Sequence, residues 1–119
     1  MTHRYAKTIR KKLRELAGLA HERELSSDLE TLDSHFIRWR RQEIDCFELN
    51  DQIHSFHQKT SRELWETYSS MEDDFLVCRA VKLGFLSKED VPEKVAEAIL
   101  LDSFVLERER CLKTENCFG

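Results

Sequence analysis

One stretch of the sequence decides the fold: residues 9–39 read IRKKLRELAGLAHERELSSDLETLDSHFIRW. Apolar side chains recur in it every three or four residues, which is the spacing that places them on one side of an α-helix. They form two stripes, first Ile9, Leu13, Leu16 and Ala20, then Leu25, Leu29, Leu32, Phe36 and Trp39. The pattern predicts that the segment up to about residue 41 is helical.

The two stripes do not continue one another. The step from Ala20 to Leu25 is five residues, which turns the apolar side by about 140° at about 100° per residue. Ser27 and Glu30 also have the spacing of a capping box, which marks helix starts. The segment is therefore either two helices that meet near Ser26 and Ser27, or one long helix whose halves face different partners. We favour the long helix, because no glycine or proline stands there to make a turn.

The composition of the chain excludes a β-rich fold. The 119 residues include three glycines and one proline, and no Asn-Gly or Asp-Gly pair is present to form a hairpin turn. Leu, Ile, Val and Phe contribute 32 residues, which is enough for a core. We expect an all-α protein of four to six helices in a single domain, residues 1–119. A long basic helical element (1–41) would pack on a helical bundle (42–113), followed by a frayed tail (114–119).

Helix start and stop signals divide the second part of the chain. Three pairs have the spacing of helix starts: Asp45 with Glu48, Thr60 with Glu63, and Ser70 with Asp73. Gly84 is predicted to end a helix, and Pro92 to begin a final one that runs to about Leu112. The segment before Gly84 is apolar on nearly all sides, so it is predicted to be the buried central helix.

The location of the protein is predicted from what the sequence lacks. It contains no run of about 20 apolar residues and no apolar segment of the kind found in signal peptides. Its four cysteines have no zinc-like spacing, and we expect Cys46 and Cys78 to act as small hydrophobic side chains. We therefore expect a cytoplasmic protein with reduced cysteines and no association with membranes.

One group of residues has metal-binding chemistry. Asp51, His54 and His57 are three residues apart, so on a helix they would share a side. A pair of solvated histidines is the more common explanation of such a pattern. No phosphate-cradling loop, dinucleotide fingerprint or nucleophile elbow is present. We therefore expect no catalytic residue, no cofactor and no enzymatic activity.

The charges are distributed unevenly along the chain. Residues 1–41 contain ten Lys and Arg against six Asp and Glu, whereas residues 42–119 contain nine against seventeen. The first 14 residues contain six basic side chains and no acidic one: Arg4, Lys7, Arg10, Lys11, Lys12 and Arg14. A second basic group is Arg38, Arg40 and Arg41. This pattern is typical of a solvated helix face or of a basic arm complemented by an acidic half; nucleic-acid binding and membrane attachment are weaker alternatives.

These observations predict a protein–protein interaction or regulatory module that forms a homodimer through its helices. The residues expected to contact a partner are Ile9, Leu13, Leu16, Leu29, Leu32, Phe36 and Trp39. The alternative is a small helical protein that binds nucleic acid through Arg4, Lys7, Arg10, Lys11 and Arg14. The third hypothesis is a metal-binding helical bundle that uses Asp51, His54 and His57.

Overall fold

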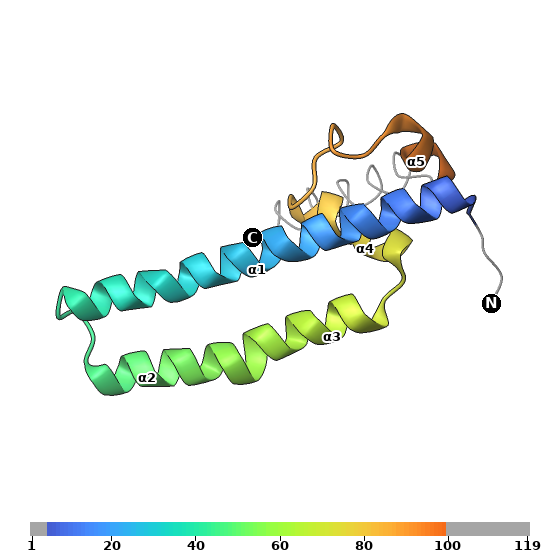
Figure 1. Cartoon of the computed structure of the whole chain (residues 1–119). Coiled ribbons are helices and arrows are strands. Elements are labelled where there is room, and N and C mark those ends of the chain that lie inside the picture. The colour runs from blue at the N-terminus through green and yellow to red at the C-terminus, as the bar shows by residue number, and fades with distance from the viewer. Residues whose placement is uncertain (1–4, 100–119) are drawn as a thin grey trace, which may run out of the picture. The chain divides into compact units, whose positions relative to one another are not determined.

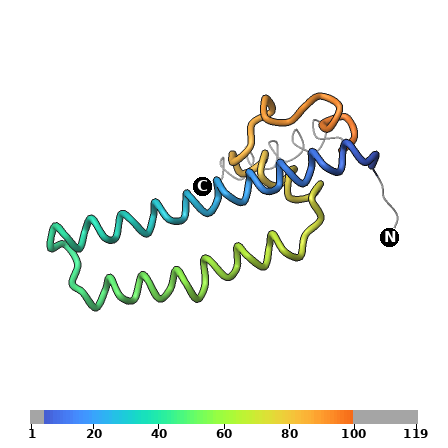
Figure 2. Tube along the Cα trace, viewed as in Figure 1, coloured from blue at the N-terminus to red at the C-terminus, as the bar shows by residue number. Residues whose placement is uncertain are grey.

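The computed structural model describes residues 5–99, and this part of the chain is all-α (Figure 1). Its elements are α1 (Lys7–Arg40), α2 (Cys46–Ser55), η1 (Phe56–Ser61), α3 (Arg62–Ser70), α4 (Asp73–Leu83) and α5 (Glu93–Ala98). The trace in Figure 2 passes from α2 through the π-helical turn η1 into α3 without a break. The described residues therefore form four helical rods, and the predictions of an all-α fold and of a long N-terminal helix that packs against later helices are confirmed.

Helix α1 is continuous over 34 residues, so it is about 50 Å long at about 1.5 Å per residue. The alternative of a break near Ser26 and Ser27 is wrong: the backbone oxygen of Ser27 accepts a hydrogen bond from the hydroxyl of Thr31 one turn later, inside the helix. The first turn contains no acidic residue to complement the positive helix end. Packing of its apolar side, rather than its end charges, therefore holds this helix together.

The C-terminal end of α1 is formed without a glycine. The Glu43 N–H donates to the Arg38 carbonyl at 2.9 Å, and the Gln42 N–H donates to the Trp39 carbonyl at 2.9 Å. These two bonds make a Schellman motif, in which the residue after the helix is left-handed. Gln42 occupies that position with a φ of 63°, a conformation that favours glycine. The chain thus leaves the helix through a residue in the left-handed conformation, which was not predicted because no glycine stands at this position.

The start of α2 is the predicted one, and the start of α3 is not. The Glu48 N–H donates to Oδ1 of Asp45 at 2.8 Å, so Asp45 is the N-cap of α2. The prediction that Thr60 opens a new helix is wrong, because Thr60 lies inside η1. The seam residues Phe56 and Leu64 are eight positions apart where a regular seam has seven. The π-helical turn accommodates the extra residue and keeps both side chains on one line.

The predicted C-terminal end of α4 is correct, and its predicted start is not. Gly84 follows the helix with a φ of 89°, as predicted for its C-terminal residue. The predicted start at Ser70 is wrong, because the N-cap of α4 is Glu72 and the Ser70 hydroxyl donates to the Glu66 carbonyl in α3. Pro92 is the N-cap of α5, close to its expected place. The predicted extension of this helix to Leu112 lies outside the described residues.

The chain divides into two compact units, and α1 contributes one half to each. Unit 1 comprises the described residues 5–20 and 71–99; unit 2 comprises residues 21–70. The core of unit 1 is apolar and is drawn from α1, α4, α5 and the loop between the last two. Its buried side chains are Leu13, Leu16, Ala17, Ala20, Leu76, Val77, Cys78, Ala80, Leu86, Val91 and Val95. The hydroxyl of Tyr5 also donates to Asp74 at 2.7 Å, which joins the start of α1 to that of α4.

Unit 2 is a helical hairpin with little buried surface. The second half of α1 lies antiparallel to the rod formed by α2, η1 and α3 (Figure 1). In this fully described unit, three side chains are buried: Ile44, Leu49 and Leu64. Two helices share one contact line, so most apolar side chains of the hairpin remain partly or largely exposed.

Candidate interaction surfaces

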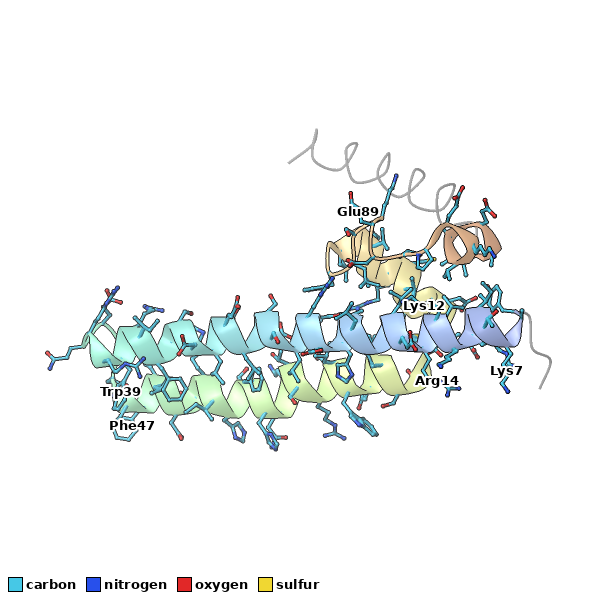
Figure 3. The ribbon with its side chains drawn as sticks, turned by 45° about the horizontal axis from the view of Figure 1, so that its top comes forward. Lys7, Lys12, Arg14, Trp39, Phe47 and Glu89 are labelled. Atoms are coloured by element: carbon cyan, nitrogen blue, oxygen red, sulfur yellow. The ribbon has the colours of Figure 1, made fainter. Side chains whose placement is uncertain are left out.

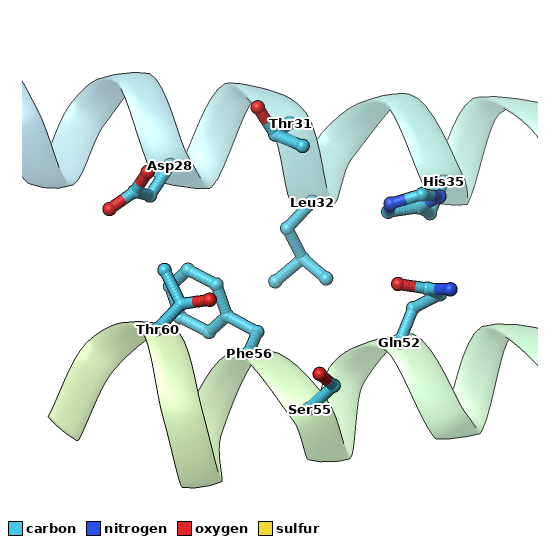
Figure 4. Close-up of a pocket in the computed structure, with 8 residues that line it drawn as sticks. All are labelled: Asp28, Thr31, Leu32, His35, Gln52, Ser55, Phe56 and Thr60. Carbon is cyan, nitrogen blue, oxygen red and sulfur yellow. The ribbon is translucent and has the colours of Figure 1, made fainter. Parts of the chain in front are cut away.

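One side of the hairpin in unit 2 holds a small polar pocket. Its volume is about 120 Å³, and its walls come from α1 and from the α2–η1 rod. Figure 4 shows Leu32 and Phe56 extending into the space between the helices. The other lining residues are polar: Asp28, Thr31, His35, Gln52, Ser55 and Thr60. This side of the hairpin therefore presents hydrogen-bonding groups rather than an apolar seam.

Ionisable side chains of α1 lie along the line where this helix contacts the second rod of the hairpin. Burial, and then the nearby charge of Glu24, raise the pKa of Asp28 above its ordinary value of 3.8. Nδ1 of His35 is shielded from solvent and has no hydrogen-bond partner within the described structure. At the other end of the hairpin, the hydroxyl of Tyr68 donates to Glu24 at 2.8 Å, and its ring stacks on His21 with centroids 4.4 Å apart. These contacts fix the register of α1 against α3.

The opposite side of the hairpin is apolar. At about 100° per residue, Leu25, Leu29, Leu32 and Phe36 fall within an arc of about 60° on α1, centred roughly 100° from the polar pocket residues. On the other rod, Leu49, Phe56 and Leu64 mark the contact line. Ile53 and Trp65 are rotated from this line in the sense opposite to Gln52.

In antiparallel helices, rotation in the same sense places residues on the same face of the pair. The apolar face of unit 2 is therefore formed by Leu25, Leu29 and Phe36 of α1 together with Ile53 and Trp65 of the second rod. Leu32 lies between the two rods and lines the polar pocket. Leu29 is 46% exposed, Ile53 38% and Trp65 65%. Leu25, Leu32 and Phe36 are half-buried. A face of this composition is typical of a surface that a partner covers.

The predicted partner-binding residues are thus separated by the structure. Leu13 and Leu16 are buried in unit 1 and Ile9 is half-buried there, so this group contributes to the chain's own core. Leu29 and Phe36 lie on the apolar face of unit 2, and Leu32 lies between the two rods, where it lines the polar pocket. Figure 3 shows Trp39 near the tip of the hairpin, where it lines a shallow pocket with Ile44 and Cys46.

The basic residues at the start of α1 share one face. Lys7, Arg10, Lys11 and Arg14 fall within an arc of about 100°, whose centre is about 140° around the helix from the buried Leu13 and Leu16. Arg10 is at the edge of the arc nearest to Leu13. Lys7, Lys11 and Arg14 are exposed and Arg10 is half-buried. We call these four residues the basic stripe. Arg4, which was predicted to belong to this group, lies outside the described residues.

Other basic residues of α1 have acidic neighbours. Nζ of Lys12, which is about 100° around the helix from the nearest residue of the basic stripe, is 3.7 Å from Oε2 of Glu15. Nε of Arg38 is 3.7 Å from Oε2 of Glu43. Within residues 5–99, none of the four side chains of the basic stripe forms an ion pair. The charge of the stripe is therefore available to an anionic partner.

The third hypothesis, a metal site, gains no support from the structure. Asp51 and His54 on α2 and His57 on η1 are all exposed. Among the described residues, no group of three or more His, Cys, Asp or Glu side chains is arranged to hold a metal ion. Over the same residues, no helix has the length and hydropathy needed to span a membrane.

The two described cysteines differ from each other. Cys78 is buried in α4, as expected of a small hydrophobic side chain, and burial followed by the charge of Asp74 raises its pKa to about 11. Cys46 is exposed at the first turn of α2, contrary to the expectation that it packs in an apolar segment. Cys111 and Cys117 lie outside the described residues.

The sequence interpretation missed the polar groups that face the second rod of the hairpin. His21, Asp28 and His35 are spaced by seven residues, so they form one line along α1. That line lies beside the apolar stripe. A search for seven-residue repeats of polar as well as apolar side chains would have found it.

Comparisons with known proteins identify no relative: no family model, curated protein or solved structure matches the chain.

Proposed function

We propose that the protein is a helix-mediated protein–protein interaction module whose unit 2 associates with a second copy of itself. The observation that carries this proposal is the apolar face of unit 2. Leu29, Ile53 and Trp65 are exposed on one side of a hairpin that buries three side chains. Apolar groups exposed together on one side of a small unit cost free energy in water until a partner covers them.

A second copy suits this face because of the shape of the hairpin. Two antiparallel helices that present a shared apolar side can pack face to face with a two-fold copy and form a four-helix bundle. Both copies then bury the same side chains, and the short core of each hairpin is extended. The polar pocket lies on the opposite side of the hairpin and stays in water. The partly exposed Leu25 and Phe36 become the inner layer of the bundle.

The test is a pair of charged substitutions on the apolar face. In the double variant Leu29→Glu/Ile53→Glu, two carboxylates would have to be buried, which disfavours association strongly. We expect the wild-type protein to sediment with twice the chain mass at micromolar concentration, and the double variant with the mass of one chain. Helix content, measured by circular dichroism, reports whether the variant keeps its fold.

Phe47→Glu provides the matched control. Phe47 is 77% exposed on α2, but it is about 160° around the helix from Leu49 and so lies away from the apolar face. This variant is expected to keep the mass of the wild type. A wild-type protein with the mass of one chain at all concentrations contradicts the proposal. A dimer that survives the Leu29→Glu/Ile53→Glu change, or that is lost in Phe47→Glu instead, contradicts the assigned surface.

A further inference from the structure

The basic stripe of unit 1 differs in chemistry and position from the apolar face of unit 2. Lys7, Arg10, Lys11 and Arg14 occur within eight residues of α1 and point to one side. This positive charge surrounds the positive end of the helix, where basic residues reduce stability rather than add to it. A helix that keeps such an arrangement presents a site suited to an anionic partner.

We infer that the basic stripe binds the phosphate backbone of a nucleic-acid duplex without reading its sequence. From Lys7 to Arg14 the helix rises about 10 Å at about 1.5 Å per residue. One strand of a duplex carries a phosphate about every 3.4 Å along the axis, so the stripe spans about three phosphates. Lys and Arg are the side chains that proteins use most for such contacts.

One member of the stripe is held in place by the protein. Arg10 is half-buried, and its Nε is shielded from solvent without a hydrogen-bond partner in the described structure. A guanidinium whose stem packs on the fold loses less conformational entropy when it binds an anion than a free side chain does. Lys7, Lys11 and Arg14 are exposed around it and can adjust to the spacing of the phosphates.

Two other anionic partners fit the stripe less well. The apolar side of this half of α1 is buried through Leu13 and Leu16, so the helix has no free hydrophobic face to enter a lipid surface. Single-stranded nucleic acid is usually held by stacking on exposed aromatic rings. The aromatic residue nearest to the stripe in sequence, Tyr5, is half-buried and bonded to Asp74 instead. The chemistry thus favours contacts with duplex phosphates alone.

Fluorescence anisotropy with a labelled 20-base-pair DNA duplex of arbitrary sequence tests the inference. The full chain is expected to bind at 50 mM salt and to lose roughly 50-fold in affinity at 200 mM, as three or so phosphate contacts imply. A second duplex of different sequence should bind equally well. The double variant Lys11→Glu/Arg14→Glu should bind at least tenfold more weakly and show a smaller dependence on salt.

The matched control is Arg40→Glu/Arg41→Glu, which changes the net charge equally but lies in unit 2. It should retain affinity within about threefold, and both variants should keep the helix content of the wild type. The inference is overturned if the duplex does not bind at 50 mM salt, or if both variants lose affinity equally. It is also overturned if phosphatidylserine vesicles or poly-glutamate bind the wild type more tightly than the duplex. Sedimentation of the same variants measures separately whether unit 2 forms a dimer, so a failure of duplex binding is distinguished from a failure of dimerisation.

Discussion

The two halves of α1 enter two different kinds of structure. In unit 1 the helix buries Leu13, Leu16 and Ala20 in an apolar core shared with α4 and α5. In unit 2 it places His21, Asp28 and His35 along the second rod, and Leu29 remains exposed. One uninterrupted helix therefore serves as a core element at one end and as one arm of an open hairpin at the other. An apolar stripe with helical spacing can thus be buried by the chain itself or left exposed for a partner.

The largest expected effect is on the free energy of unfolding when a leucine is replaced by alanine, and it should differ between the two units. Leu76 in unit 1 is 1% exposed, so Leu76→Ala creates a cavity and should lower the free energy of unfolding by about 2–5 kcal/mol. Leu29→Ala should cost less than about 1 kcal/mol in a single chain, because nearly half of the side chain is already in water. Urea denaturation measures both values.

Measuring the stability of both variants at several protein concentrations distinguishes a core within one chain from a surface covered by a second copy. The effect of Leu76→Ala should not depend on concentration, since it concerns a core within one chain. The effect of Leu29→Ala should grow with concentration if a second copy covers this side chain. If Leu29→Ala lowers the free energy of unfolding as much as Leu76→Ala does in dilute protein, then Leu29 is buried within one chain. Unit 2 would then have a closed core like that of unit 1.

A middle-sized effect is expected from two glycine substitutions, one inside α1 and one just after its C-terminal end. Gly18 lies inside the helix with no atom within 4 Å of the place of an added Cβ, so Gly18→Ala should stabilise the protein by about 0.4–1 kcal/mol. At Gln42 the favourable change is in the other direction, because glycine adopts a φ of 63° more readily than glutamine does. Gln42→Gly should therefore stabilise by about 1 kcal/mol. Thermal melts followed by circular dichroism test both, and a lower melting temperature in either variant would contradict the local geometry described for that position.

The smallest effect concerns the polar side of unit 2. Burial and Glu24 raise the pKa of Asp28 in the folded state above 3.8, so its charged form opposes folding. This cost is present above the folded-state pKa and disappears as the pH falls below the unfolded value. Asp28→Asn should therefore raise the melting temperature slightly at pH 7, and the gain should vanish near pH 3. A melting temperature that does not rise in Asp28→Asn at pH 7, or a gain that persists at pH 3, would contradict the unfavourable burial of the Asp28 carboxylate.

The sequence by itself determined the helices, because their signals are local. The three- and four-residue recurrence of apolar side chains gave α1, Asp45 began α2, and the left-handed Gly84 ended α4. The same local signals failed at Thr60, where capping chemistry was present but a π-helical turn kept the chain helical. A cap is only one contribution of about 1 kcal/mol, and the alignment of Phe56 and Leu64 on one seam outweighs it.

Only the tertiary structure decided which apolar stripe is buried and which is exposed. Leu16 and Leu29 have the same residue type and equivalent spacing, yet one is buried beside α4 and α5 and the other is left open on a two-helix hairpin. Burial depends on how many elements surround a side chain, and the spacing of residues along one helix carries no information about that number. The basic stripe was visible as composition, but the direction in which it faces followed from the packing of the opposite side of α1.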